Sequence, residues 1–175
     1  PRRQKLCIKK LTQGINGKED LRKAFIKCAA AETFLSWNYY KKTNSNNLNE
    51  KLREGTIPSE FFEINVSTHL EIIEIFYLEQ IYQKRLGKGS ALEKQIYSLF
   101  KNSDGKYAGN LTHDQWWESY GPQIWEAMLC ALTNGSKQTE KKIILDKYSY
   151  DQLKKTTNGT IPLEEFASKP QFLRW

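Results

Sequence analysis

The segment 112–132 constrains the fold of this chain more than any other part of the sequence. Three of the chain's five tryptophans lie in it. Large apolar residues recur through it at spacings of three and four: Trp117, Tyr120, Ile124, Met128 and Leu132. This spacing places their side chains on one face of an α-helix, and so apolar a face must be buried against other elements. The segment therefore predicts a long helix in the interior of a helical protein.

The start of this helix and one irregularity within it are also predicted. Thr112 and Gln115 have the spacing of a capping box, in which each side chain accepts a hydrogen bond from the backbone N–H of the other residue. Pro122 lacks a backbone donor and clashes with the carbonyl four residues earlier. We therefore expect a kink or a break near Gly121.

A second long helix is predicted from about Lys18 to Lys42. Its apolar stripe consists of Leu21, Phe25, Cys28, Glu32, Leu35 and Tyr39. Alanines beside this stripe would let another helix approach closely. A buried Glu32 would need a partner such as Arg174, because an unpaired internal carboxylate is costly. The alternative is that Glu32 lies in water at the edge of the stripe.

The segment from Phe61 to Leu86 is ambiguous between helix and strand. Apolar residues keep helical spacing along it, but β-branched and aromatic residues are dense enough around 72–77 to suggest a strand. Length favours a helix, because 26 residues without Gly or Pro exceed a usual strand. Apolar groups on more than one face suit a helix packed between neighbours.

Shorter helices are expected in the rest of the chain. One ends at Gly55, another begins at Ser90 and ends near Asn102, and Glu140–Leu153 predicts a short helix or a helix plus coil. The sequence contains no internal repeat. The expected fold class is therefore all-α, a helical bundle with long antiparallel helices and irregular loops, in a single domain spanning 1–175.

Charge and hydropathy bound the partners of this domain. The net charge of +7 favours anionic partners in general, so nucleic acid, a sulfated glycan, anionic lipid and an acidic protein surface all fit. Alternatively, Lys and Arg only keep an aromatic-rich surface soluble. The most apolar run, 70–82, contains three glutamates, so a membrane span is not expected. Any signal peptide or anchor is expected to lie outside this sequence.

The sequence contains no recognisable catalytic constellation. Its two histidines, His69 and His113, belong neither to an H-E-x-x-H pattern nor to a triad order. The turn 87–90 lacks the first glycine of a phosphate loop, and 102–105 lacks the first carboxylate of a calcium loop. We therefore expect no enzymatic activity, no cofactor and no metal.

The three cysteines, Cys7, Cys28 and Cys130, show no C-x-x-C spacing. This disfavours zinc and thioredoxin chemistry, and an odd number leaves one cysteine without an internal partner. Four glycosylation sequons would mark surface loops in a host cell that glycosylates its proteins, at Asn65, Asn110, Asn134 and Asn158.

Five blocks spread along the chain resemble one known family. The helix at 112–132 contains Trp-Trp-Glu at 116–118, Gly-Pro-Gln-Ile-Trp at 121–125 and Met-Leu-Cys-Ala-Leu at 128–132. The other blocks are PRRQKLC at 1–7, AAAETFLSW at 29–37, GTIP at 55–58 and PQFLRW at 170–175. In this order they resemble Duffy-binding-like domains, the adhesion modules of malaria-parasite surface proteins. Their variants are most similar to the large erythrocyte membrane proteins of the falciparum parasite.

This resemblance implies a fold and a function. The fold would be the middle helical subdomain of such a domain, with a disulfide joining Cys28 and Cys130, while Cys7 pairs outside this sequence. The function would be non-enzymatic cell adhesion to a host receptor, of the intercellular adhesion molecule or sulfated glycosaminoglycan type. Antibodies are further expected partners, and specific nucleic acid is not. The expected location is extracellular, on the infected erythrocyte, within a larger anchored protein.

Basic residues are the candidate ligand contacts. They are Arg2, Arg3, Lys5, Lys41, Lys42, Lys84, Arg85 and Lys88. A sulfated glycan would need several of them on one face. A structural explanation competes for the two pairs 41–42 and 84–85, since cations near a helix C-terminus interact favourably with the helix dipole.

The segment 62–86 departs from the family. Duffy-binding-like domains place a Phe-Gly-Asp-Tyr-Arg-Asp type element after the Ile-Pro turn, and this chain has no counterpart. It is either a divergent variant or a replacement. Replacement predicts the alternative function, an engineered scaffold or immunogen that presents this helical segment to antibody, with Glu71, Glu74 and Glu79 facing outward.

Overall fold

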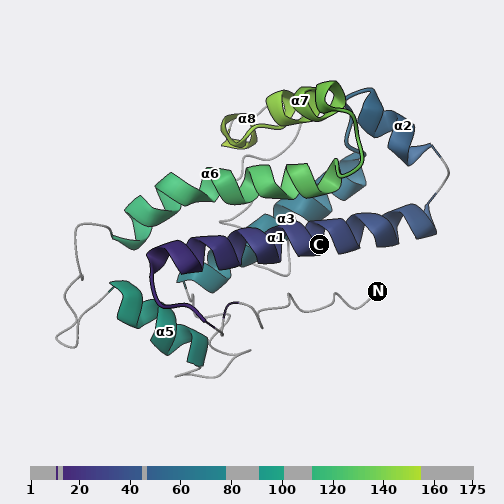
Figure 1. The fold of residues 1–175 in the computed structure, drawn as a ribbon. Helices are drawn as coiled ribbons and strands as arrows, with labels where there is room; N and C mark the ends of the chain where they lie inside the picture. The colour runs from purple at the N-terminus through teal and green to yellow at the C-terminus, as the bar shows by residue number, and fades with distance from the viewer. Residues whose placement is uncertain (1–10, 12–13, 45–46, 78–90, 101–111, 155–175) are drawn as a thin grey trace.

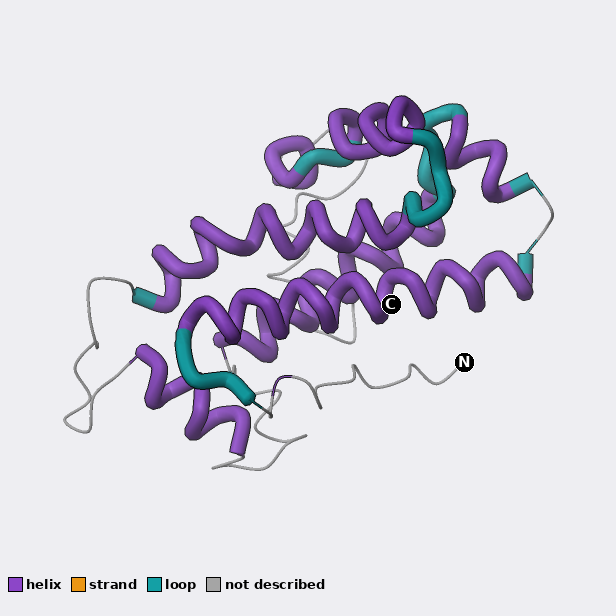
Figure 2. The backbone as a smooth tube through the Cα atoms, viewed as in Figure 1, coloured by secondary structure: helices purple, strands orange, loops and turns teal. Residues whose placement is uncertain are grey.

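The computed structural model describes residues 11, 14–44, 47–77, 91–100 and 112–154. Within these ranges the regular elements are helices and none is a strand, which confirms the expected all-α class (Figure 2). The α-helices are α1 (Lys18–Thr43), α2 (Leu48–Arg53), α3 (Ser59–Tyr77), α5 (Ala91–Phe100), α6 (His113–Leu132), α7 (Gln138–Lys147) and α8 (Tyr150–Lys154).

Three long helices, α1, α3 and α6, form the centre of the bundle (Figure 1). α3 runs antiparallel to α1, because Phe25 early in α1 contacts Phe76 late in α3, whereas Trp37 contacts Phe61. α6 runs in the same direction as α1 (Figure 1), so the expected antiparallel packing holds for α3 against both neighbours. α7 follows α6 through a turn and packs against it, and α2 packs against α7.

The buried face of α1 differs from the expected stripe. The stripe is buried at its start, but Leu35 and Tyr39 are 60% and 67% exposed. The buried residues of α1 are Leu21, Ala24, Phe25, Cys28, Ala29, Thr33 and Trp37. From Ala29 onward these residues recur every four positions. Each step of four residues turns about 40° around the helix axis, so the buried line winds slowly around α1. A line of this kind forms a ridge that packs against helices crossing α1. Glu32 is half-buried, and Arg174 lies outside the described residues.

α3 is the most deeply buried of the three long helices. The prediction of a helix rather than a strand is confirmed for the described residues up to Tyr77, while 78–86 lie outside the described part. α1 and α6 both pack on it, as expected for a helix with apolar groups on more than one face. Even its polar side chains are buried, at Asn65, Ser67, Thr68, His69 and Glu71.

α6 begins with the predicted capping box. The backbone N–H of Gln115 donates to Thr112 Oγ1 at 3.3 Å, and Thr112 N–H donates to Gln115 Oε1 at 3.0 Å. Of the two outcomes expected near Gly121, the break is wrong, because α6 continues through Pro122 to Leu132, and the kink stays a prediction. Tryptophans on both sides, Trp117 and Trp125, are buried, and their packing outweighs the hydrogen bond that proline removes.

Gly55 ends α2, as predicted. Its φ of 76° lies in the left-handed region, and Gly55 N–H and Thr56 N–H donate to the carbonyls of Leu52 and Lys51, the two bonds of a Schellman motif. The turn also lies against α7, because Lys147 Nζ donates to the Gly55 carbonyl at 3.0 Å. A side chain at this position would overlap Ile143.

Aromatic rings fill the core where the long helices meet. Phe76 of α3 stacks on Trp116 of α6, with ring centroids 4.6 Å apart, and meets Phe25 of α1 and Phe100 of α5 edge-on. All four side chains are fully buried. Burying one such ring contributes roughly 1.5–3 kcal/mol, so this cluster ties four helices together.

Candidate functional site

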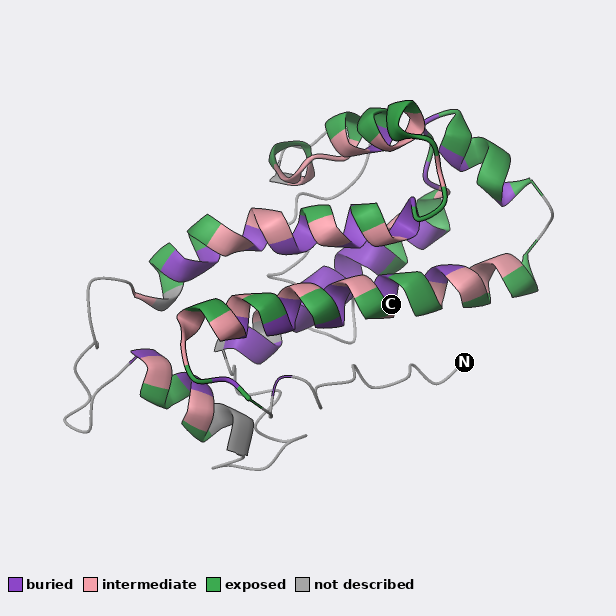
Figure 3. Cartoon of the chain, in the orientation of Figure 1, coloured by how far each residue is buried: buried purple, intermediate pink, exposed green. Residues whose placement is uncertain are grey.

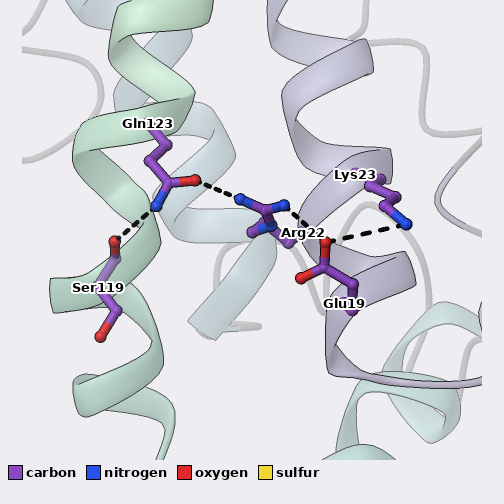
Figure 4. Close-up of polar contacts among 5 residues, drawn as sticks. All are labelled: Glu19, Arg22, Lys23, Ser119 and Gln123. Atoms are coloured by element: carbon purple, nitrogen blue, oxygen red, sulfur yellow. Dashed lines mark hydrogen bonds and ion pairs between the residues drawn. The ribbon is translucent and has the colours of Figure 1, made fainter.

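One polar cluster links the first turns of α1 to the middle of α6 (Figure 4). Arg22 of α1 donates to Gln123 Oε1 of α6 at 2.5 Å and to Glu19 Oε1 at 2.6 Å. Its guanidinium lies 5.4 Å from the ring centroid of Tyr120. The hydrogen bond from Arg22 lowers the pKa of the exposed Glu19 carboxyl. Lys23 also approaches Glu19, at 3.9 Å, so one carboxylate is shared by two cations and Glu19 offsets part of their charge.

Most of the candidate basic residues lie outside the described part of the chain, namely Arg2, Arg3, Lys5, Lys84, Arg85 and Lys88. Lys41 and Lys42 are described, and both lie in the last turn of α1, where they complement the helix dipole. Lys41 Nζ lies 5.7 Å from the ring centroid of Trp37, while Lys42 is exposed. The role of these eight residues as ligand contacts stays a prediction.

Of the three glutamates expected to face outward, Glu71, Glu74 and Glu79, the structure contradicts the position of Glu71. Glu71 is 6% exposed, because it lies on the stretch of α3 that is buried all round. The side chain of Glu74 and all of Glu79 lie outside the described residues. The described part of 62–86 is a core helix, so a surface that presents Glu71 to antibody is excluded.

The expected disulfide is also absent, since no bond joins Cys28 and Cys130. Cys28 is buried in α1, whereas Cys130 is exposed on α6. Partial burial and the nearby carboxylate of Glu126 raise the pKa of the Cys130 thiol, and Lys141 opposes this shift. The two cysteines lie on helices that pack together, but in different environments. The resemblance of sequence blocks does not predict this difference in burial.

A cavity of about 520 Å³ lies between α6, α7 and the start of α8. Its lining includes Trp125, Leu129 and Leu145, and its charged residues are Glu126, Lys142 and Asp146. Because both signs of charge line it, electrostatics favours no particular ligand class there. The wall is held together by Trp125 Nε1, which donates to the Tyr148 carbonyl at 2.7 Å.

Two polar residues of α3 are buried without hydrogen-bond partners among the described residues, His69 and Asn65. His69 contacts the rings of Trp117, Trp125 and Tyr150, and burial lowers its pKa to about 3. Asn65 is fully buried, so the sequon there does not mark a surface loop as expected. The sequon at Asn134 does lie in an exposed turn, and the other two lie outside the described residues.

The structure also exposes a surface that the sequence pattern assigned to the interior. Phe34, Leu35 and Tyr39 project from the second half of α1 and are 41%, 60% and 67% exposed. A stripe with a regular repeat of 3.6 residues placed Leu35 and Tyr39 in the interior. The four-residue step from Ala29 to Trp37 would have moved the buried line away from Leu35.

The described residues offer neither a metal site nor a membrane helix. No group of three or more metal-ligating side chains gathers among them. Nor does any helix in these ranges combine the length and the apolar character that crossing a bilayer demands. What the described residues do offer is exposed helix surface over an aromatic core.

A family model described as the Duffy binding domain matches residues 1–174. The chain therefore belongs to the Duffy binding domain family, which confirms the resemblance of the five blocks. Members of this family are receptor-binding adhesion modules on the surface of parasites. Comparisons with curated proteins and with solved structures give no match.

Proposed function

We propose that this chain is a non-enzymatic adhesion module that binds a receptor on host cells. It acts as part of a larger anchored antigen of the malaria parasite, displayed on the infected erythrocyte. The match of the family model to 1–174 carries this proposal, because it spans nearly the whole chain. The receptor class is an adhesion protein of the intercellular adhesion molecule type or a sulfated glycosaminoglycan.

Two properties of the chain bear on the choice between these receptor classes. The net charge of +7 attracts any anionic surface and would speed encounter with either class. The apolar side chains exposed on α1 favour a protein, because a sulfated glycan offers mainly charged and hydroxyl groups. A protein receptor is therefore the better supported of the two.

Binding at two salt concentrations tests this function. Immobilised intercellular adhesion molecule one, heparin and duplex DNA are each titrated with the chain at about 50 mM and about 200 mM NaCl. Specific adhesion predicts that one receptor stays bound at the higher salt while DNA is released. Equal binding of heparin and DNA, with loss of both in moderate salt and no protein receptor bound, would show that net charge alone explains the signal.

A further inference from the structure

One face of α1 is apolar, exposed and bounded by lysines. We call it the α1 outer face, and it consists of Lys27, Ala31, Phe34, Leu35, Tyr39 and Lys42. All six residues are exposed. Figure 3 shows exposed segments recurring along α1, and in Figure 1 the last turns of α1 extend past the end of α6. This half of α1 is therefore accessible to another molecule.

Exposed apolar side chains are concentrated on this face. Six large hydrophobic residues are exposed in the described ranges, and three of them belong to the α1 outer face. The other three occur singly on α3, α5 and α7, at Ile64, Tyr97 and Ile143. Scattered exposed hydrophobics are normal, whereas a contiguous set marks an interaction surface.

The charges at this face have one sign. Lys27 and Lys42 lie at its two ends, about 22 Å apart at 1.5 Å per residue. From Leu21 to the end of α1 the only acidic residue is Glu32, which is half-buried. A ligand that covers the apolar centre would therefore meet a positive charge near either end.

We propose that the α1 outer face docks an apolar helix of a partner protein that carries acidic residues near both its ends. Side chains at 31, 35 and 42 follow one line along α1, and such a ridge fits the groove of a second helix. A second copy of this chain fits poorly, because in either orientation it would bring lysines against lysines. The inference rests on the proposed function and assigns the receptor contact to one surface.

Two designed peptides test this surface without any receptor. Both are amphipathic helices of 16 residues with leucines at helical spacing, one with glutamates and one with lysines at its ends. We expect the acidic peptide to bind the chain at least about tenfold more tightly than the basic one, measured by fluorescence anisotropy. Leu35→Glu should weaken the acidic peptide by about tenfold or more, because it places a carboxylate at the apolar centre.

A matched variant separates a specific effect from a general one. Ile64→Glu makes the same change at an exposed residue of α3 and should alter peptide affinity less than about twofold. Circular dichroism establishes that both variants fold. Equal affinity for the two peptides, no binding of either, or equal effects of the two variants would overturn the proposal.

Two further outcomes assign the face to another occupant and also overturn the proposal. A wild-type dimer in sedimentation that Leu35→Glu converts to monomer would assign it to a second copy. Heparin binding that depends on Lys42 and Leu35, without peptide binding, would assign it to a glycan. If peptides bind as expected but no host receptor does, the adhesion function fails while the docking surface stands. A receptor that binds Leu35→Glu as well as wild type would instead overturn the assignment of its contact.

Discussion

At the scale of single residues, His69 is the polar side chain whose environment has the clearest consequence. It is fully buried on α3 among the rings of Trp117, Trp125 and Tyr150. Aromatic rings cannot solvate an imidazolium as water does, so burial lowers the pKa of His69 from 6.5 to about 3. The folded protein therefore holds this histidine neutral at every pH at which cells operate.

This shift makes folding stability depend on pH. Above pH 6.5 the histidine is neutral in both the folded and the unfolded chain, so it adds no pH dependence. Between 6.5 and about 3 only the unfolded chain takes up the proton, so the free energy of unfolding falls as pH falls. We expect this residue to remove about 2 kcal/mol between roughly pH 7.5 and pH 5, measured by urea unfolding.

The substitution His69→Leu isolates this contribution from that of the carboxylates. Leucine has a similar volume and no proton to bind, so the variant should lose less stability than wild type on the same change of pH. The difference between the two pH profiles is the contribution of His69. Parallel profiles would show that the histidine is solvated in the folded state and that its packing between α3, α6 and α8 is wrong.

At the scale of elements, the turn after α2 is held by both local and long-range constraints. Gly55 adopts a positive φ to end the helix, and its carbonyl accepts a hydrogen bond from Lys147 of α7. A methyl group added at Gly55 would overlap Cγ2 of Ile143. The same glycine therefore ends α2 and lets α7 approach it.

We expect Gly55→Ala to destabilise the domain by about 3 kcal/mol. Left-handed backbone costs an alanine roughly 1–2 kcal/mol, and the overlap with Ile143 adds about 1 kcal/mol or more. Gly135→Ala is the matched control, because Gly135 also has a positive φ but no atom near the new methyl. It should cost only about 1–2 kcal/mol. Urea unfolding measures both changes.

A double variant tests the contact between the two elements directly. Adding Ile143→Ala to Gly55→Ala removes the methyl group that the new side chain meets, so it should recover part of the loss. Equal costs at the two glycines, with no recovery in the double variant, would contradict the close approach of α7 to this turn.

Local features of these elements were predictable, and tertiary ones were less so. The capping box at Thr112 and the end of α2 at Gly55 depend on residues within a few positions of each other, so spacing predicts them. The exposure of Leu35 depends on the angle at which neighbours cross α1, which no local pattern contains. A kink or a break was expected near Gly121, and the helix is not broken there. The packing of the buried tryptophans around Pro122 is likewise tertiary, so the local pattern did not contain it.

At the scale of the whole molecule, the position of α3 decides how the chain presents itself. A replaced segment was expected to present an outward acidic face, yet Glu71 and His69 are buried because α1 and α6 pack on the same helix. The departure of 62–86 from the family pattern contained no information on this burial. Among the described residues, exposed apolar side chains gather on α1, and two of them, Leu35 and Tyr39, were assigned by the sequence to the core.

Hydrogen exchange can test this arrangement across the whole domain. Backbone amides open to solvent more rarely where a helix is covered on several sides, so residues 65–72 of α3, all buried, should exchange most slowly among the described helices. α2 and α8 are short and partly exposed, and their amides should exchange fastest. α7, which packs on α6 and α2 and is exposed elsewhere, provides the internal reference. If the amides of α3 exchanged as fast as those of α7, α3 would be open to solvent and could be a presented surface. The argument that the partner docks on the α1 outer face would then fail.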